Sequence, residues 1–311
     1  MTDELLVIGV DGGGTKTLVW VAGEDAIPLG EATGPASAVI PGAEAHSAEV
    51  IAQVVREALR VAGREDARVR ALCAGLAGVG REAPRSALLT ALEALDLAED
   101  VVVRADAAVA VDDAFDEGSG ILLIAGTGSV AFGRGPAGAE ARAGGWGPIC
   151  GDEGSGAWIG RRALSVVTAA SDGREPETAL TGALLTVVEV NDVDDLIPWA
   201  ARATPAQLAT LAPVVAAVAD AGDLRANAIL SLAAEELVLH VRALARKLFG
   251  DERAAIPVAL TGGLLAPGGP LRRRVEHRLR SAVPGSQLHA EAVVPVRGAV
   301  KNALRVLEGK N

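Results

Sequence analysis

One short stretch near the start of the chain gathers the residue types that bind phosphate. In VIGVDGGGTKTLVW (7–20), three glycines at 12–14 follow an apolar run and precede Thr-Lys-Thr at 15–17. Glycine lets the backbone turn sharply and approach a ligand closely, and backbone N–H groups with hydroxyls and one cation suit an anion. The stretch predicts a phosphate-binding turn, with an ordinary glycine-rich hairpin as the alternative.

This turn differs from two common phosphate motifs. A Walker loop requires lysine after its second glycine, whereas Thr15 follows Gly14 here. A dinucleotide fingerprint requires a third glycine where this chain has Thr17. Both motifs also open a helix, but residues 17–22 are mostly apolar and predict a strand. We therefore expect the phosphate to lie in a β-hairpin turn.

Two later stretches repeat the pattern of an apolar strand that ends in glycine. GTGS at 126–129 offers backbone N–H groups and the hydroxyls of Thr127 and Ser129, and TGG at 261–263 ends another apolar run. Glycine is common wherever a chain reverses direction, but three apolar strands that each end in a glycine turn are more than chain reversal alone explains. Together they indicate a nucleotide held between two domains.

Acidic residues stand beside small residues at three places. Asp11 precedes the first glycines, where it can hold Mg²⁺ beside a triphosphate or simply form a turn. Asp106 ends VVVRAD, where a carboxylate can accept a proton from a substrate hydroxyl or cap the next helix. Asp152 and Glu153 in GDEGSG can bind sugar hydroxyls or metal, or form a loop in which Asp152 or Ser155 caps a helix.

The elements that must position these residues alternate between strand and helix patterns, which favours an α/β fold. Strands are expected at 5–10, 17–22, 27–34, within 69–78 and at 101–106, with helices at 47–63 and 84–95. The same strand–turn–strand pattern begins again at 120–135, so two related domains and a chance likeness both stay open. Mostly helical segments follow, then a strand with a glycine turn near 261, a basic helix from Pro270 and a closing amphipathic helix.

Length, net charge and cysteine content restrict the classes of protein to which the chain could belong. A chain of 311 residues is long enough for two domains of about 150 residues each. Its net charge is −11, and the sequence lacks the basic patch that a nucleic-acid-binding protein would carry. The N-terminal apolar run is too short for a signal peptide or membrane span, and Cys73 and Cys150 form no CxxC motif. We expect a reduced, cytoplasmic protein, with Cys73 in the core.

Taken in order, the motifs resemble those of N-acetylglucosamine kinases: DGGGTKT (11–17), GLAG (75–78), DA (106–107), GTGS (126–129), GGWGPICGDEGSGAWIGRRAL (144–164), LTGGLL (260–265) and PVRGAVKNAL (295–304). These kinases are grouped with activator ATPases of benzoyl-CoA reductase, within the superfamily of sugar kinases, actin and heat-shock chaperone ATPases. The likeness spans essentially the whole chain. GGWG with GDEGS beside DGGGTKT is a specific combination, whereas each glycine loop alone is not.

The resemblance implies an α/β protein of two ribonuclease-H-like domains with an inter-domain nucleotide cleft, the actin-like ATPase fold. The N-terminal domain would comprise 1–117 with the closing helix 297–311, and the larger C-terminal domain 118–296. The implied activity is ATP- and Mg²⁺-dependent phosphorylation of the 6-hydroxyl of an amino sugar, with N-acetylglucosamine first. The implied partner is a small sugar, with no nucleic acid and no membrane, and the resemblance leaves room for a homodimer.

The resemblance also assigns roles to residues. ATP contacts would come from Gly12, Gly13, Gly14, Thr15, Lys16, Thr127, Gly128, Gly262 and Gly263. Sugar contacts would come from Ser37, Gly78, Asp106, Gly145, Trp146, Asp152 and Glu153. Asp106 would be the catalytic base, and Asp11 would support Mg²⁺, directly or through water. Trp146 is expected to form a pocket wall or to be a buried structural residue.

Two departures from the family pattern concern the sugar. Some relatives carry Asn where this chain has Ser37 and Val130, and both positions are expected near the sugar. Neither residue replaces the amide, so glucosamine, N-acetylmuramic acid and other hexoses stay open as substrates. An ATP-driven reductase activator is a further alternative, but it needs paired cysteines for an iron–sulfur cluster. A sugar-responsive repressor would need an added DNA-binding segment. His46, His240, His277 and His289 receive no role.

Overall fold

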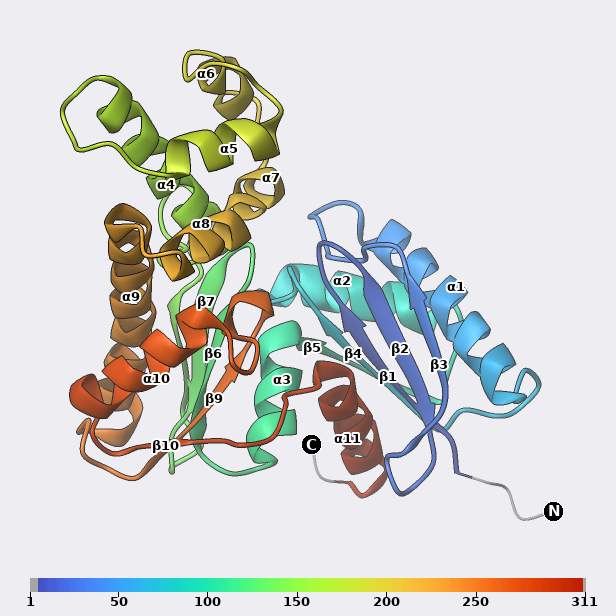
Figure 1. Cartoon of the computed structure of the whole chain (residues 1–311). Coiled ribbons are helices and arrows are strands. Elements are labelled where there is room, and N and C mark those ends of the chain that lie inside the picture. Colours follow the sequence, from blue (N-terminus) through green and yellow to red (C-terminus); the bar gives the residue numbers. More distant parts are fainter. Residues whose placement is uncertain (1–4, 310–311) are drawn as a thin grey trace. The chain divides into compact units, whose positions relative to one another are not determined.

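The computed structural model describes residues 5–309, which fall into two compact units. The first unit contains the described residues up to Gly118 and those from Glu291 onward, and the second unit is Ser119–Ala290. Two separate parts of the chain therefore build the first unit (Figure 1). Within residues 5–309, no helix is both long and apolar enough to cross a bilayer.

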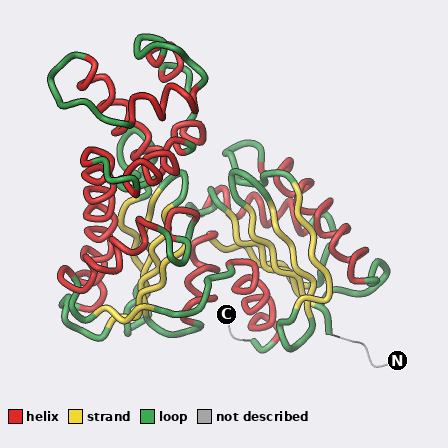
Figure 2. Tube along the Cα trace, in the orientation of Figure 1, coloured by secondary structure: helices red, strands yellow, loops and turns green. Residues whose placement is uncertain are grey.

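The first unit is a five-stranded sheet with helices on both faces. Its strand order is β3-β2-β1-β4-β5, in which β2 and β3 are antiparallel neighbours and β4 and β5 run parallel to β1. The strands are β1 (Val7–Gly12), β2 (Thr17–Ala22), β3 (Pro28–Gly34), β4 (Ala71–Leu76) and β5 (Asp100–Ala105). The helices are α1 (Glu44–Ala62), α2 (Glu82–Glu93), α3 (Asp106–Phe115) and α11 (Pro295–Leu307) (Figure 2).

Alternation along β1 decides which helices cover which face. Ile8 and Val10 pack in the same core cluster as the buried side of α1, whereas Val7 packs with residues of α3 and α11. This follows because successive side chains of a strand point to opposite faces. Gly9 shares the α11 face, and a Cβ there would lie 2.6 Å from the carbonyl oxygen of Val296. Glycine at this position therefore allows α11 to approach the sheet closely.

The helices of this unit largely follow the expected pattern. In α1 the predicted apolar face is buried, and the helix begins at Glu44, earlier than the expected residue 47. It ends at Gly63, which has the left-handed conformation (φ 65°) that glycine accepts readily. Cys73 in β4 is fully buried, which confirms its place in the core.

The second unit repeats the topology of the first. Its strand order is β10-β9-β6-β7-β8, so that β6, β7, β8, β9 and β10 occupy the places of β1 to β5. The two-domain likeness that the repeated hairpin pattern suggested is thus present at the level of topology. Its strands are β6 (Gly120–Ala125), β7 (Ser129–Arg134), β8 (Glu140–Gly144), β9 (Ile256–Thr261) and β10 (Ser286–Leu288).

Helices make up most of the rest of this unit. They are α4 (Gly156–Ser171), α5 (Leu180–Val188), α6 (Leu196–Ala200), α7 (Pro205–Ala209), α8 (Leu211–Asp220), α9 (Leu224–Phe249) and α10 (Pro270–Ala282), with a 3₁₀ turn, η1 (Gly263–Leu265). One core cluster joins Ile121 and Leu123 of β6 to the buried faces of α4, α8, α9 and α10. This shared core fixes the glycine turns at the strand ends against the helices.

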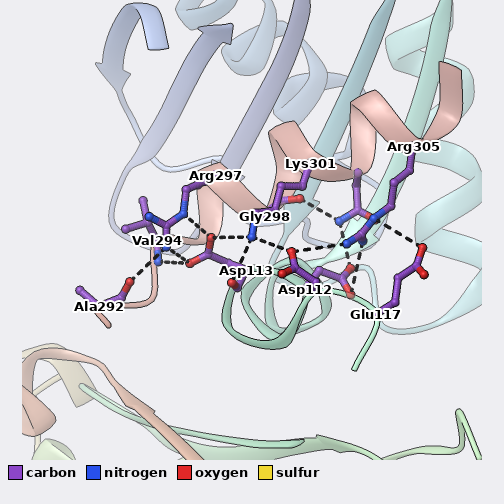
Figure 3. Close-up of polar contacts among 11 residues, drawn as sticks. Asp112, Asp113, Glu117, Ala292, Val294, Arg297, Gly298, Lys301 and Arg305 are labelled. Carbon is purple, nitrogen blue, oxygen red and sulfur yellow. Dashed lines mark hydrogen bonds and ion pairs between the residues drawn. The ribbon is translucent and has the colours of Figure 1, made fainter. Parts of the chain in front are cut away.

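In the first unit, two buried aspartates of α3 hold the returning helix α11 (Figure 3). Asp113 accepts hydrogen bonds from Arg297 Nε (2.5 Å) and from the backbone N–H of Val294 (2.7 Å). Asp112 accepts one from Asn302 Nδ2 (2.9 Å) and pairs with Arg104 at 3.4 Å. These bonds attach the end of the chain to the helix that begins at Asp106.

We expect Asp113→Ala to lower the free energy of unfolding by about 2–3 kcal/mol, because Arg297 and the Val294 N–H would lose their acceptor in a poorly solvated place. Urea unfolding of the intact chain measures the loss. Glu117→Ala is the matched control, since this exposed residue lies 3.9 Å from Arg305 and surface pairs contribute under about 1 kcal/mol. Equal losses in the two variants would contradict the role given to Asp113.

Candidate functional site

The register of three parallel strands places the acidic residues of the first unit at one sheet edge. Gly12 of β1 lies opposite Leu76 of β4, which lies opposite Ala105 of β5. The carboxyl ends of these strands therefore form a row, and Asp106 follows directly as the first residue of α3. Asp11 alternates onto the same face of the sheet as α3, because Gly12 faces the other way. In α/β sheets, ligands commonly bind at this edge.

The pKa values of both carboxyl groups at this edge are raised. Burial and, to a smaller extent, the negative charge of Asp106 raise the pKa of Asp11 to about 6, although Lys16 opposes the shift. Burial also raises the pKa of Asp106. Because a poorly solvated pair of carboxyl groups is costly when both are ionised, this edge favours a bound cation or a shared proton. Titratable groups perturbed in this way are typical of functional sites.

The alternative in which Asp106 caps the following helix is wrong. The N-cap position belongs to Ala105, and no side chain within residues 5–309 caps α3. Asp106 Oδ1 instead accepts the N–H of the adjacent Ala107 at 2.8 Å. One carboxylate oxygen is therefore held by the backbone in the first turn of the helix, where the helix dipole favours negative charge.

The glycine turn between β1 and β2 is anchored on one side. Ala38 donates its N–H to the carbonyl of Gly13 (3.2 Å), and Gly13 donates to Lys16 (3.0 Å). In a trans peptide the N–H points opposite to the preceding C=O, so anchoring the Gly13 carbonyl directs the Gly14 N–H away from Ala38. A Cβ on Gly14 would meet nothing within 4 Å. The turn is therefore open where a Gly14 Cβ would lie, and its Gly14 N–H is turned away from Ala38.

Two predicted sugar-binding residues of this unit have internal contacts. Ser37 is buried, and its hydroxyl lies 2.7 Å from that of Thr17. Gly78 has φ 93°, and a Cβ there would lie 2.2 Å from the carbonyl of Val39. Both residues join the loop after β3 to its neighbours, beside Gly12, whose own Cβ would collide with Ser37 Oγ at 2.3 Å. Their contact with a sugar stays a prediction.

In the second unit, helix α4 fixes the hairpin turn between β6 and β7. Gly156 and Ala157 donate their N–H groups to the carbonyls of Gly126 (2.8 Å) and Thr127 (3.2 Å). By the same geometry of the trans peptide, the N–H groups of Thr127 and Gly128 point away from α4. Ser155 Oγ accepts the N–H of Trp158, which confirms the predicted helix cap.

The third glycine turn lies beside the second. Strands β6 and β9 are parallel, with Ile124 opposite Thr261. Gly262 has φ 97°, and a Cβ there would lie 2.3 Å from the carbonyl oxygen of Ala125. Glycine is therefore required at 262, and the turn at 262–263 packs against the end of β6. The fold thus brings together two of the three turns predicted to bind ATP.

The GGWG and GDEGSG segments form one loop around the β6–β7 turn. Gly145 donates its N–H to Ser129 O (3.0 Å), and Ser129 Oγ donates to Glu153 O (2.7 Å). Asp152 is buried and accepts the N–H of Gly147 at 3.3 Å. A Cβ on Gly128 would lie 2.8 Å from Asp152 Oδ2. The carboxylate of Asp152 therefore lies directly beside the turn.

Trp146 is not a buried structural residue, so that alternative is wrong. Its side chain is 69% exposed, and the Arg142 guanidinium lies 4.9 Å from the ring centroid. Cation–π contact of this kind orients an aromatic ring that the core does not hold. An exposed, oriented indole at this loop can form the wall of a binding site.

His240 received no role from its sequence pattern, but the structure places it beside Glu153. Its Nε2 lies 3.6 Å from Glu153 Oε2, and a Cβ on Gly144 would lie 2.8 Å from the same nitrogen. Burial lowers the pKa of His240, which favours the neutral ring, although Glu153 opposes this. Nδ1 is buried without a hydrogen-bond partner among the described residues. If Nδ1 carried the proton, the lone pair of Nε2 would face the carboxylate of Glu153, which is repulsive. If Nε2 carries the proton, the only cost is an unpaired acceptor at Nδ1, so we infer that Nε2 is protonated and faces Glu153.

We expect Asp11→Asn to stabilise the protein more at pH 8 than at pH 4.5. The Asp11 pKa is 3.8 in the unfolded reference and about 6 in the fold, so its ionisation destabilises the fold as pH rises through that interval. Asparagine removes this penalty, which amounts to at most about 3 kcal/mol above pH 7. Urea unfolding at both pH values, without Mg²⁺ or nucleotide, measures it. An equal effect at the two pH values would contradict the burial of an ionised Asp11.

Comparison with known proteins gives relatives that match over most of their length. The chain is 33% identical over 261 residues to an N-acetylmuramic acid/N-acetylglucosamine kinase of Clostridium acetobutylicum, covering 83% of this chain and 85% of that protein. It is 30% identical over 312 residues to an N-acetyl-D-glucosamine kinase of Dictyostelium discoideum, covering 96% and 98%.

A solved structure matches at the level of the whole fold. A candidate N-acetylglucosamine kinase of Chromobacterium violaceum superposes with a TM-score of 0.80 at 33% identity, covering 96% of this chain and 99% of that one. With two sheets of the same strand order, the chain has the two-domain actin-like ATPase fold. The model of the BadF/BadG/BcrA/BcrD ATPase family matches residues 8–303, and the chain belongs to this family.

Proposed function

We propose that this chain is an ATP-dependent kinase that phosphorylates the 6-hydroxyl of an amino sugar, with N-acetylglucosamine as the first candidate. At the coarser level, it is an ATP-dependent sugar phosphotransferase, in line with its family and relatives. The observation that carries the proposal of phosphoryl transfer is that Asp11 and Asp106 lie at the sheet edge that also carries the glycine turn, whereas the amino sugar is proposed from the relatives. In phosphoryl transfer, a carboxylate activates the acceptor hydroxyl, and backbone N–H groups of a glycine turn bind the phosphates.

We assign the ATP phosphates to backbone N–H groups of two turns. In the first unit these belong to residues 12–16, where the Gly14 N–H points away from Ala38 and Lys16 adds a positive charge. In the second unit, Thr127 and Gly128 present N–H groups that point away from α4. Gly262 and Gly263 are assigned to the border of the adenosine. Backbone N–H groups fixed before the ligand arrives bind phosphate without reordering the chain.

The residues at the Asp11 edge fit a magnesium ion. The described residues contain no cluster of three or more His, Cys, Asp or Glu that could hold a metal, but Mg²⁺ commonly takes one or two carboxylates with water and phosphate oxygens. A second cation beside Lys16 would relieve the repulsion that raises the Asp11 pKa. A bound Mg²⁺ supplies charge neutralisation at the transferred phosphoryl group. Asp11 is the residue assigned to it, directly or through water.

Asp106 is assigned as the general base. It would accept the proton of the sugar 6-hydroxyl as that oxygen forms a bond to the γ-phosphorus and the bond to the ADP oxygen breaks. Burial raises its pKa and so strengthens it as a base, while the Ala107 N–H keeps one oxygen in place. A positioned base contributes roughly 10²–10⁴ in rate.

The sugar is assigned to the loop of Gly145, Trp146, Asp152 and Glu153. The two carboxylates accept hydrogen bonds from hydroxyls, and the exposed indole offers an apolar face to a pyranose ring. Ser37 already has its hydroxyl beside Thr17, so it gives limited support for recognising an acetamide. Glucosamine and N-acetylmuramic acid are therefore the alternative substrates.

The alternative of a reductase-activating ATPase fits the cysteines poorly. Burial raises the pKa of the Cys73 thiol to about 12, and only a thiolate ligates iron well. Cys150 is exposed in the loop assigned to the sugar. Iron analysis of protein purified without oxygen distinguishes the two functions, since a kinase would contain no stoichiometric iron.

We expect purified protein to release ADP only when an amino sugar is added, and Asp106→Asn to lower kcat by about 10² or more. A coupled ADP assay with N-acetylglucosamine, glucosamine, N-acetylmuramic acid and glucose measures the first, and calorimetric ATP titration checks that the variant keeps its affinity for ATP. Asp100→Asn is the matched control, because this exposed residue opens β5 at the opposite end from Asp106. Absence of turnover with all four sugars would contradict sugar kinase activity, and near-normal turnover of Asp106→Asn would contradict the base.

We expect His240→Phe to raise the KM for the sugar while the KM for ATP stays unchanged, because the ring shape is kept and the N–H that faces Glu153 is lost. His240→Gln keeps a donor on the side chain and should recover much of the sugar affinity. Thermal unfolding of both variants controls for damage to the core. A phenylalanine variant with an unchanged sugar KM would contradict the positioning role of His240.

A further inference from the structure

Helix α10 carries a concentration of positive charge that the proposed kinase site does not use. Its sequence, PLRRRVEHRLRSA, has five arginines and a histidine against one glutamate, in a chain of net charge −11. Leu271, Val275 and Leu279 face the core. The cations therefore lie on the sides and outer face of the helix.

Three of these arginines and the histidine line one groove in the second unit. Its volume is about 610 Å³, and Arg273, Arg274, His277 and Arg278 form the wall from α10. The facing wall includes Asp220 at the end of α8, with Ser231 and Glu235 from α9. We call this hollow the α9/α10 groove. Its volume suits a small molecule larger than a bare phosphate ion.

Two of the groove's guanidinium groups lack a neutralising carboxylate. Arg274 donates to the side-chain oxygen of Asn227 (2.6 Å) and to Pro270 O (3.1 Å), and Arg273 donates to the carbonyl of Gly268. Among the described residues, neither has a carboxylate within 4.0 Å. By contrast, Arg278 pairs with Glu235 across the groove.

These contacts hold the two arginine side chains in place but use only some of their N–H donors. A guanidinium has five N–H donors, and each of these groups is attached to uncharged acceptors that leave its charge in place. Fixed guanidinium groups with free donors match phosphate oxygens in charge and geometry. The opposite wall supplies Asp220 and Ser231, which accept hydrogen bonds from hydroxyls.

We propose that the α9/α10 groove binds a phosphomonoester carried on a hydroxylated sugar. The phosphate lies against Arg273 and Arg274, with His277 beside them, and the sugar hydroxyls face Asp220 and Ser231. A sugar 6-phosphate and a nucleoside monophosphate share this chemistry. The acidic residues of the facing wall disfavour an extended polyanion such as nucleic acid or an acidic peptide.

Isothermal titration of the full chain with glucose 6-phosphate, AMP and inorganic phosphate tests the groove. We expect the double variant Arg273→Ala/Arg274→Ala to bind the esters roughly a hundredfold more weakly than the parent, since two charge-assisted contacts are lost. Arg280→Ala is the matched control: it removes an exposed cation of the same helix that does not line the groove. It should bind like the parent. Preference for glucose 6-phosphate or for AMP identifies the source of the phosphomonoester.

Several outcomes would contradict the groove's assignment. Unchanged ester affinity in the double variant places binding elsewhere, and equal affinity for inorganic phosphate removes the role of Asp220 and Ser231. A short DNA duplex or polyglutamate that binds while both esters fail would indicate a macromolecular partner. Because these titrations need no turnover, they stay informative even if the protein phosphorylates no sugar.

Discussion

Two carboxyl groups share a poorly solvated edge of the first sheet, and much of that unit serves to keep them there. The parallel register of β1, β4 and β5 brings Asp11 and Asp106 to the same edge, where burial and mutual repulsion raise the pKa of Asp11 to about 6. Asp106 begins α3, and α3 is held by α11 through buried Asp112 and Asp113 (Figure 3). The position of the proposed base therefore depends on contacts at the far end of its own helix.

The second unit uses the same topology for a different task. Where the first unit presents carboxylates at its strand ends, the second presents a turn whose carbonyls are taken up by the start of α4. The long loop that follows β8 wraps this turn and brings Asp152 beside Gly128. Both copies thus carry a glycine turn, and the first adds the acidic pair Asp11 and Asp106 at its sheet edge.

Sequence patterns predicted all the strands except β8 and β10, together with the glycine turns and the main helices, because these depend on neighbouring residues. They failed where the outcome depended on distant partners. Trp146 could not be placed, because its exposure depends on how its loop folds. The alternative of Asp106 as a helix cap failed for a local reason, since Asp106 already lies in the first turn of α3 and accepts the N–H of the adjacent Ala107. The contact between His240 and Glu153 joins a helix to a loop far away in sequence. Helical spacing puts His240 on the same side as the buried Leu237 and Val241, and this spacing was the sequence signal that could have indicated a partly buried histidine.

The first unit is built from two separate segments of the chain, and this affects its folding during synthesis. One face of its sheet, with Val7, Ala71 and Cys73, is covered in part by α11, which leaves the ribosome only after the entire second unit. At about 5–20 residues per second, translation would leave that face incomplete for on the order of ten seconds or more. During this interval the nascent chain exposes an apolar surface that chaperones can recognise, so a premature stop before Pro295 would yield an aggregation-prone product rather than a shorter working protein.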